Sequence, residues 1–286
     1  MAGICEMQTL KFAPPRLIPF SATAEHFLHK QFHKACARLI SSERHLNKIL
    51  ARAIQAPEPE FRVPLAYALS ALGPKLDFTI QANSINKILR GWVQGTGKIV
   101  RVDNWFVGAH DWSKVLINTE DDSIVQEARV LIDVNFRFAE IESYANYRQR
   151  LEAGDATWRN IGRLDSIEKI ENYFNRFKAL YHSIEKRGLL SPDEFSNQAS
   201  GHGEGPPQRR IGIAIGADGT QYRLPGGQHR FAIGLIMGCQ IPVQLLLIHV
   251  NRLKALADPE QALPTALISN EVRQLAATGR VGGGGG

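Results

Sequence analysis

Residues 210–249 decide the fold that we expect for this chain, and they read RIGIAIGADGTQYRLPGGQHRFAIGLIMGCQIPVQLLLIH. The apolar run at 210–216 predicts a strand. The pair Asp218-Gly219 is typical of a hairpin turn, which makes Asp218 a turn residue rather than a catalytic one. Residues 221–224 then predict the returning strand. The stretch therefore begins with a β-hairpin.

A bend, a helix and a second buried strand follow the hairpin. The two glycines at 226–227 allow the chain to turn sharply. Apolar spacing predicts a helix from about Gln228 to a stop at Gly238, and the run at 241–249 predicts a buried strand. Residues 231–250 are mostly apolar and about as long as a membrane span. Because their pattern changes halfway, we predict a helix and a strand there and no contact with a membrane.

The bend carries the clearest chemical signal in the sequence. The first N–H groups of a helix have no partner within the helix, and the helix dipole adds partial positive charge there, which suits a phosphate. An arginine in the first turn can add two parallel hydrogen bonds. The predicted phosphate-binding residues of the bend are Gly226, Gly227, Gln228, His229 and Arg230. A purely structural bend, whose arginine pairs with a local carboxylate, is the alternative.

The rest of the chain adds helices and one more strand. Apolar residues recur at helical spacing in several segments. The predicted helices cover residues 22–55 (one long helix or two stacked ones), 64–72, 84–93, 123–151 and 167–187. Ser166 is placed to cap the last of them, and Gly188 to end it. Residues 98–103 alternate as a half-buried strand does. We therefore expect an α/β (mixed α+β) protein, a small sheet with helices that is preceded by a helical N-terminal region.

Basic charge is concentrated towards the N-terminus of the chain. The 286 residues have a net charge of +6, and residues 1–95 hold 12 Lys and Arg against 6 Asp and Glu. Glycines near residue 95 indicate a domain edge. We predict a basic helical region at 1–95, an α/β domain at 96–255, and a short helix with a flexible glycine tail at 256–286. The basic region could bind DNA, and a solvated helical face is the alternative.

Composition excludes several classes of protein. Hydrophobic residues make up 44% and charged residues 22% of the chain, so it is not disordered throughout. Three widely spaced cysteines argue against a disulfide scaffold and a cysteine-rich zinc module, and for a reducing cytoplasm. Prolines interrupt residues 1–20, which excludes a secretory signal there. We expect a cytoplasmic protein without a resident metal site.

The run from Ile211 to Val250 resembles the core of the ParB/sulfiredoxin superfamily. That core has a hairpin, a Gly-x-His-Arg or Gly-x-Arg-Arg turn, a helix and an Ile-Pro-Val strand. The segment from Ser183 to Leu189 resembles the family's Ser-Ile-x-x-x-Gly-Leu segment. The resemblance covers mainly residues 165–250, is loose over 98–164 and is absent over 1–95.

This resemblance implies that the chain binds a nucleotide, ATP or CTP, together with Mg²⁺. In the family the turn before the helix holds the phosphates, which assigns that role here to Gly227, His229 and Arg230. The sulfiredoxin pattern adds Arg176 and Ser183 from the preceding helix.

Two departures from the family limit what the resemblance implies. Gln228 stands where sulfiredoxins carry their catalytic cysteine, and glutamine cannot act as a thiolate nucleophile, which argues against reduction of a sulfinic acid. The 36 residues after Val250 are too few for the DNA-binding and dimerisation domains of a partitioning protein.

Three functions stay open on these grounds. The first is an ATP-dependent phosphotransferase or NTPase acting on a small molecule, which needs a catalytic base, and the candidates are Glu185, Asp111 and, at the end of the predicted strand 98–103, Asp103. The second is a nucleotide-responsive DNA-binding protein that uses the N-terminal helices. The third is a scaffold that kept the fold and lost the ligand. Four tryptophans could stack on a base, although packing in the core or at a rim is the favoured interpretation. They are Trp92, Trp105, Trp112 and Trp158.

Overall fold

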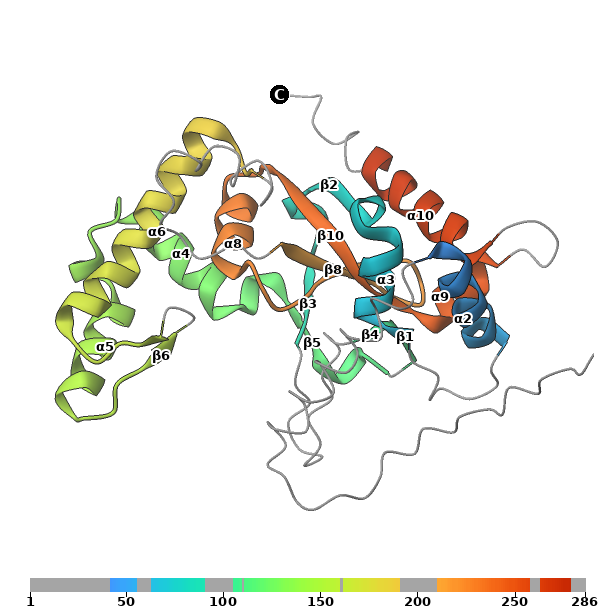
Figure 1. Ribbon diagram of the computed structural model, residues 1–286. Coiled ribbons are helices and arrows are strands. Elements are labelled where there is room, and N and C mark those ends of the chain that lie inside the picture. Colours follow the sequence, from blue (N-terminus) through green and yellow to red (C-terminus); the bar gives the residue numbers. More distant parts are fainter. Residues whose placement is uncertain are drawn as a thin grey trace, which may run out of the picture.

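A mixed sheet with helices at both of its sides forms the described part of the protein (Figure 1). The computed structural model describes residues 42–55, 63–90, 105–109, 111–159, 162–190, 210–257 and 263–278. Within these ranges there are eight α-helices, one sheet of eight strands and a separate two-stranded pair. The predicted mixed α/β class is confirmed.

The helices and strands have the following bounds. The helices are α2 (Glu43–Gln55), α3 (Leu65–Leu72), α4 (Ser123–Asp133), α5 (Glu142–Glu152), α6 (Ile167–Arg187), α8 (Gln228–Ile236), α9 (Val250–Leu256) and α10 (Pro264–Thr278). The strands of the large sheet are β1 (Val63–Pro64), β2 (Asp77–Gln81), β3 (Lys87–Leu89), β4 (Trp105–Gly108), β5 (Leu116–Asn118), β8 (Ile211–Ile215), β9 (Gln221–Arg223) and β10 (Gln240–His249). The separate pair is β6 (Trp158–Arg159) with β7 (Gly162–Arg163).

Strand β10 organises the large sheet. The strands follow the order β1-β4-β10-β8-β9-β3-β5, and β2 also pairs with β10. The pairs β10–β4, β10–β8 and β3–β9 are parallel, whereas β10–β2, β1–β4, β8–β9 and β3–β5 are antiparallel. Every residue of β8 is buried. A strand covered on both faces needs continuous apolar sequence, which explains the unbroken apolar run of β8.

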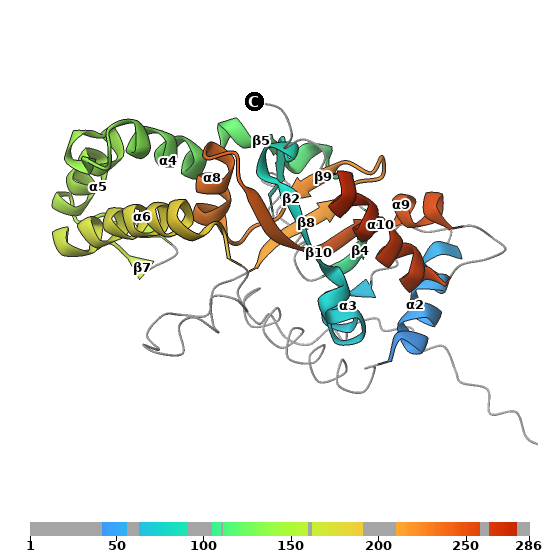
Figure 2. The same ribbon diagram turned by 90° about the horizontal axis from the view of Figure 1, so that it is seen from above.

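Two groups of helices flank the sheet. Helices α4, α5 and α6 extend to one side, with α8 between them and the sheet, and α2, α3, α9 and α10 lie on the other side (Figures 1 and 2). A single large hydrophobic cluster runs through the sheet and both helix groups. Helix α8 is thus packed between α4, α6 and the strands β8 and β10, which fixes the position of the bend that precedes it.

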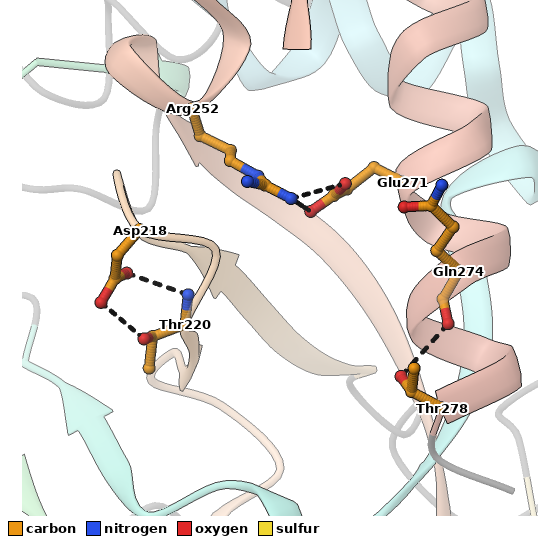
Figure 3. A network of polar contacts seen from close by, with 6 residues as sticks. All are labelled: Asp218, Thr220, Arg252, Glu271, Gln274 and Thr278. Atoms are coloured by element: carbon orange, nitrogen blue, oxygen red, sulfur yellow. Dashed lines mark hydrogen bonds and ion pairs between the residues drawn. The ribbon is translucent and has the colours of Figure 1, made fainter. Parts of the chain in front are cut away.

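The order predicted for residues 210–249 is confirmed element by element. β8 and β9 form an antiparallel hairpin. At its turn the Asp218 carboxylate accepts hydrogen bonds from the Thr220 backbone N–H at 2.9 Å and from the Thr220 hydroxyl at 2.7 Å (Figure 3). These bonds lower the pKa of Asp218, and the predicted turn role of this residue is confirmed. α8 and β10 then follow.

Most of the predicted helices are also present. α2 covers the described part of the first of them, and α3 lies within the second. The predicted segment 123–151 contains two helices, α4 and α5, which residues 134–141 separate, and α5 extends to Glu152. α6 begins where the Ser166 hydroxyl accepts a hydrogen bond from the Lys169 N–H at 3.2 Å, and it ends at Gly188, as predicted. The segments 22–41, 98–103 and 191–209 lie outside the described residues.

The prediction of a helix over residues 84–93 is wrong for residues 84–90, the part of it that the structure describes. Residues 87–89 form strand β3, which pairs with β5 on one side and β9 on the other. Ile85, Ile88 and Leu89 are buried at a spacing that also suits a helix. In a strand covered on both faces, neighbouring residues are buried together, and this imitates helical spacing.

Residues 63–90 are part of the large sheet. They supply β1, β2 and β3, and Asp77 of β2 accepts a hydrogen bond from Gln244 of β10 at 2.8 Å and pairs with Arg210 before β8. The predicted domain edge near residue 95 lies outside the described residues, and strands from both sides of it pair within one sheet.

The C-terminal helices are joined by a buried ion pair. Arg252 of α9 donates hydrogen bonds to both carboxylate oxygens of Glu271 of α10, to Oε1 at 3.0 and 2.8 Å and to Oε2 at 3.0 Å (Figure 3). Glu271 is only 2% exposed. α10 is longer than the short helix predicted there. Within the described ranges, no helix has both the length and the apolar character that crossing a bilayer requires.

Candidate functional site

The bend between β9 and α8 has a backbone that favours glycine. Gly226 and Gly227 have φ angles of 118° and 60°, in the region that side-chain-bearing residues seldom adopt. The first hydrogen bond within α8 runs from the Phe231 N–H to the Gly227 carbonyl at 2.9 Å. The N–H groups of the first turn are therefore left to a ligand or to water.

A cavity of about 440 Å³ opens at this bend. Its walls include the first residues of α8 and of α4, so the N-terminal ends of two helices meet there. The β6 strand and the end of β9 complete it. The lining residues are Ile88, Arg90, Asp122, Ser123, Ile124, Trp158, Arg159, Arg223, Pro225, Gln228 and His229. Three arginines and one carboxylate give the cavity a positive balance.

Arg223 is the most unusual residue of this cavity. It lies on β9, is 1% exposed, and is the largest fully buried side chain in the described part of the chain. None of its three guanidinium nitrogens has a hydrogen-bond partner among the described residues. Burial lowers the pKa of Arg223 to about 10. A buried cation without hydrogen bonds is unfavourable, and this arrangement is typical of a site whose partner is a ligand.

Two groups stabilise Arg223 in part. Its guanidinium carbon lies 5.2 Å from the centre of the Phe231 ring, a cation–π contact. The carboxylate of Asp122 attracts it through space. Asp122 also caps α4, because its Oδ1 accepts hydrogen bonds from the backbone N–H groups of Ile124 at 3.0 Å and Val125 at 3.3 Å. Neither group replaces the hydrogen bonds that a guanidinium loses on burial.

His229 lines the cavity as an uncharged side chain. Its ring lies edge-on to Phe177, with centroids 4.4 Å apart. Its Nε2 is 3.4 Å from the Tyr173 hydroxyl. Burial, and next the positive charge of Arg159, lower the pKa of His229 to about 4. The imidazole is therefore neutral near pH 7, and it can offer a hydrogen bond to a ligand but no charge.

A buried carboxylate is hydrogen-bonded to the tyrosine that neighbours His229. Glu127 of α4 is 8% exposed and accepts hydrogen bonds from the hydroxyls of Tyr173 at 2.5 Å and Tyr147 at 2.9 Å. Burial, together with the charge of Glu127, raises the pKa of Tyr147 to about 12 and also raises the pKa of Tyr173. Arg159 donates to the Tyr147 hydroxyl through Nε at 2.9 Å. This network fixes both Arg159 and His229 at the cavity wall.

The five residues predicted to bind phosphate at the bend have different positions in the structure. Gly226 and Gly227 form the turn itself, and Gln228 and His229 line the cavity. Arg230 is not among the lining residues. Its guanidinium instead donates a hydrogen bond to the carbonyl of Leu190, after the end of α6, where the side chain is 8% exposed. Arg230 therefore joins α8 to the segment after α6.

The four other predicted site residues that the structure describes do not line the cavity. Ser183 accepts a hydrogen bond from Arg187 at 2.6 Å, and Glu185 contacts His182 at 3.1 Å, both on α6. Asp111 accepts one from the Ser113 N–H at 2.9 Å. Arg176 is exposed on α6, and its charge contributes to the low pKa of His229. The structure thus does not bring together the predicted carboxylates Glu185 and Asp111 with the bend.

Sequence reasoning missed Arg223, Asp122 and Arg159. A signal for Arg223 was present, because a charged residue ends the returning strand of the hairpin, three residues before the glycines. Asp122 and Arg159 lie about 100 and 60 residues before Arg223 in the chain, so only folding brings them there. A larger open groove, of about 1100 Å³, lies along α2, β2 and α10 and contains none of the predicted site residues.

No described group of three His, Cys, Asp or Glu side chains is placed to hold a metal ion. The cavity offers Mg²⁺ a single carboxylate, Asp122, so the ion would depend on the phosphates of a nucleotide for its other ligands. Comparisons of this chain with protein-family models, with curated proteins and with solved structures find no match.

Proposed function

We propose that this protein binds a nucleotide, ATP or CTP, with its phosphates in the cavity at the start of α8. The observation that carries the proposal is Arg223, a fully buried guanidinium whose nitrogens lack hydrogen-bond partners in the described structure. A phosphate group offers the paired oxygens that a guanidinium binds best. The resemblance of residues 165–250 to the ParB/sulfiredoxin superfamily supports the same ligand class.

The surroundings of Arg223 favour a multiply charged anion. Arg90 and Arg159 line the same cavity, against the single carboxylate of Asp122. The uncapped N–H groups of α8 add donors and partial positive charge. The cavity volume of about 440 Å³ lies within the range of small-molecule sites. A phosphate chain would thus meet arginine side chains and backbone N–H groups in one cavity.

A thermal-shift titration tests this function. Wild-type protein is titrated with ATP, CTP and GTP, with and without Mg²⁺, alongside Arg223→Met and Arg230→Met. A ligand at 100 times its Kd adds about 2.7 kcal/mol to the stability of the folded state, which for a chain of this size raises Tm by about 5–10 °C. We expect the shift in wild type and in Arg230→Met, and its loss in Arg223→Met.

The comparison with Arg230→Met makes the result specific to the cavity. Both arginines are buried, and burial lowers the pKa of each to about 10, but only Arg223 lines the cavity. A shift that survives in Arg223→Met and disappears in Arg230→Met would refute the cavity and restore the direct role of Arg230 that the sequence predicted. No shift with any nucleotide in wild type would refute nucleotide binding altogether.

One residue of the cavity is also suited to serve phosphoryl transfer, as a catalytic base. A transferase needs a base near the acceptor, and Asp122 is the carboxylate in the cavity wall. Asp122→Asn keeps a residue that caps a helix equally well and removes the charge. If the protein is a transferase or NTPase, this variant loses turnover and still binds the nucleotide. If the protein only binds, the variant binds more tightly, because a like charge is gone.

DNA binding through residues 1–95 remains the alternative function. The described part of this region holds exposed Arg44, Lys48 and Arg52 on α2, while Leu46 and Leu50 of the same helix are buried in the core. Binding of a labelled duplex that weakens steeply with salt, and that changes on adding ATP or CTP, would favour it.

A further inference from the structure

Trp158 is the most exposed large apolar side chain in the described part of the chain. Its exposed fraction is 72%, and the other large apolar residues that are exposed there, Val130, Ile167 and Leu263, are aliphatic. Trp158 lies on β6 and lines the same cavity as Arg223 and His229. An indole exposed to this extent leaves roughly 100–180 Å² of apolar surface in water. Such a surface at the rim of a binding cavity is typical of a contact made by the ligand.

The strand that carries Trp158 is held in place. Trp158 and Arg159 pair with Arg163 and Gly162 of β7. Arg159 is bound to the Tyr147 hydroxyl and lies over the Tyr147 ring, 4.9 Å from its centre. The segment after β7 is tied back by a hydrogen bond from the Leu164 N–H to the Thr157 carbonyl at 2.8 Å. The indole is therefore presented from an anchored pair of strands.

The cavity also offers two kinds of contact that belong to different parts of one ligand. Arg223, Arg159 and the N-terminus of α8 suit negative charge, and the exposed indole suits a flat aromatic face. A nucleotide combines a phosphate chain with a planar base in one molecule. Inorganic phosphate, polyphosphate and phosphosugars share only the charged part.

We infer that Trp158 is the stacking platform for the base of the bound nucleotide, a proposal that rests on the phosphate-binding function proposed above. Stacking on an aromatic side chain uses the flat face of the base and reads no pattern of donors and acceptors, so it tolerates every base. Trp158 would thus select nucleotides over other phosphates, and it would bind purines at least as well as pyrimidines. The choice between ATP and CTP would then fall to the other side chains of the cavity.

The test measures the affinity of the full chain for three ligands by calorimetry: ATP, CTP and inorganic tripolyphosphate. The variants are Trp158→Ala, Trp158→Phe and, as a control at a distant exposed apolar site, Leu263→Ala. Loss of one base–aromatic stack corresponds to about a 5- to 150-fold loss of affinity. We expect that loss for ATP and CTP in Trp158→Ala, unchanged binding of tripolyphosphate, and recovery of most of the nucleotide affinity in Trp158→Phe.

Tryptophan emission gives a second readout. ATP should change the intrinsic emission of wild-type protein and should leave the emission of Trp158→Phe unchanged while that variant still binds it. If Trp158→Ala binds ATP as wild type does, or if it loses tripolyphosphate equally, the stacking platform is refuted while phosphate binding stands. If wild type binds neither ATP nor tripolyphosphate, the proposed function itself fails, and the role of Trp158 fails with it.

Discussion

Replacing Arg223 with methionine should stabilise the ligand-free protein. Burial lowers the pKa of Arg223 from its ordinary value to about 10, and the size of that change corresponds to roughly 3 kcal/mol. Because the folded-state pKa of this base is depressed, the unfavourable free energy is fully present at every pH below about 10, and it is relieved only above that pH. At pH 7 the folded protein therefore carries the whole cost of the buried cation.

Methionine removes this cost and fills a similar space. The loss of the cation–π contact with Phe231, at 5.2 Å, offsets about 1–2 kcal/mol of the gain. The guanidinium has no hydrogen-bond partners in the described structure, so its removal leaves no protein group unpaired. The net expectation is a gain of about 1–2 kcal/mol in the free energy of unfolding, or about 2–5 °C in Tm.

The assay is denaturant and thermal unfolding at pH 7 without ligand, with Arg230→Met as the matched control. Arg230 is buried to a similar extent but donates a hydrogen bond to the Leu190 carbonyl. Burial lowers the pKa of Arg230 equally, so its removal relieves a similar cost, but it leaves that carbonyl unpaired at about 1–3 kcal/mol. The gain in the free energy of unfolding should therefore be smaller for Arg230→Met than for Arg223→Met, and this order would support a binding residue held at a cost to stability. A destabilised Arg223→Met would refute the reasoning, since Arg223 would then have structural partners.

Three further predictions concern named contacts. His229 has a pKa of about 4 in the folded state, below its unfolded value, so its contribution to stability is present above the unfolded pKa and is lost as pH falls through 6 towards 4. Between unfolding curves at pH 7 and pH 4.5, the free energy of unfolding of wild type should fall by about 2–3 kcal/mol more than that of His229→Gln. Equal losses in the two proteins would contradict this. Arg252→Ala leaves the buried Glu271 carboxylate unpaired and should lower the free energy of unfolding by about 3 kcal/mol. The double variant Arg252→Met, Glu271→Leu should regain most of this stability. A double variant no more stable than the single one would argue against the ion pair. Gly227→Ala should lower the free energy of unfolding by about 1–2 kcal/mol because of the φ of 60° at this position, and Gly227→Asn should lower it by less. Unfolding midpoints of both variants that match wild type would show that the bend tolerates a side chain.

The hairpin, the bend and α8 could be predicted from the sequence because their signals are local. An Asp-Gly pair sets the turn between β8 and β9, and two adjacent glycines allow the φ angles of 118° and 60° before α8. These preferences belong to a few residues and their own backbone. The same holds for the cap at Ser166 and the stop at Gly188. The sequence could therefore place the bend, and with it the start of the candidate site.

The remaining walls of the site depend on contacts between distant segments. Whether Ile85, Ile88 and Leu89 belong to a helix or a strand was decided by β5 and β9, which pair with β3 on its two sides. The N-terminus of α4 and the β6 strand reach the bend only through the packing of the helices around α8. No local preference encodes such contacts, because their free energy exists only once both partners are in place.

The sequence by itself determined a hairpin, a glycine bend and an amphipathic helix in that order. It also predicted a phosphate-binding role for Arg230, the arginine that follows the bend. Only the tertiary structure decided which arginine faces the cavity. Arg230, in the first turn of α8, turns towards the Leu190 carbonyl, while Arg223, at the end of β9, is enclosed at the cavity with no hydrogen-bond partner among the described residues. The physical reason is that burial and hydrogen bonding are properties of a side chain's neighbours, and most of those neighbours come from other parts of the chain.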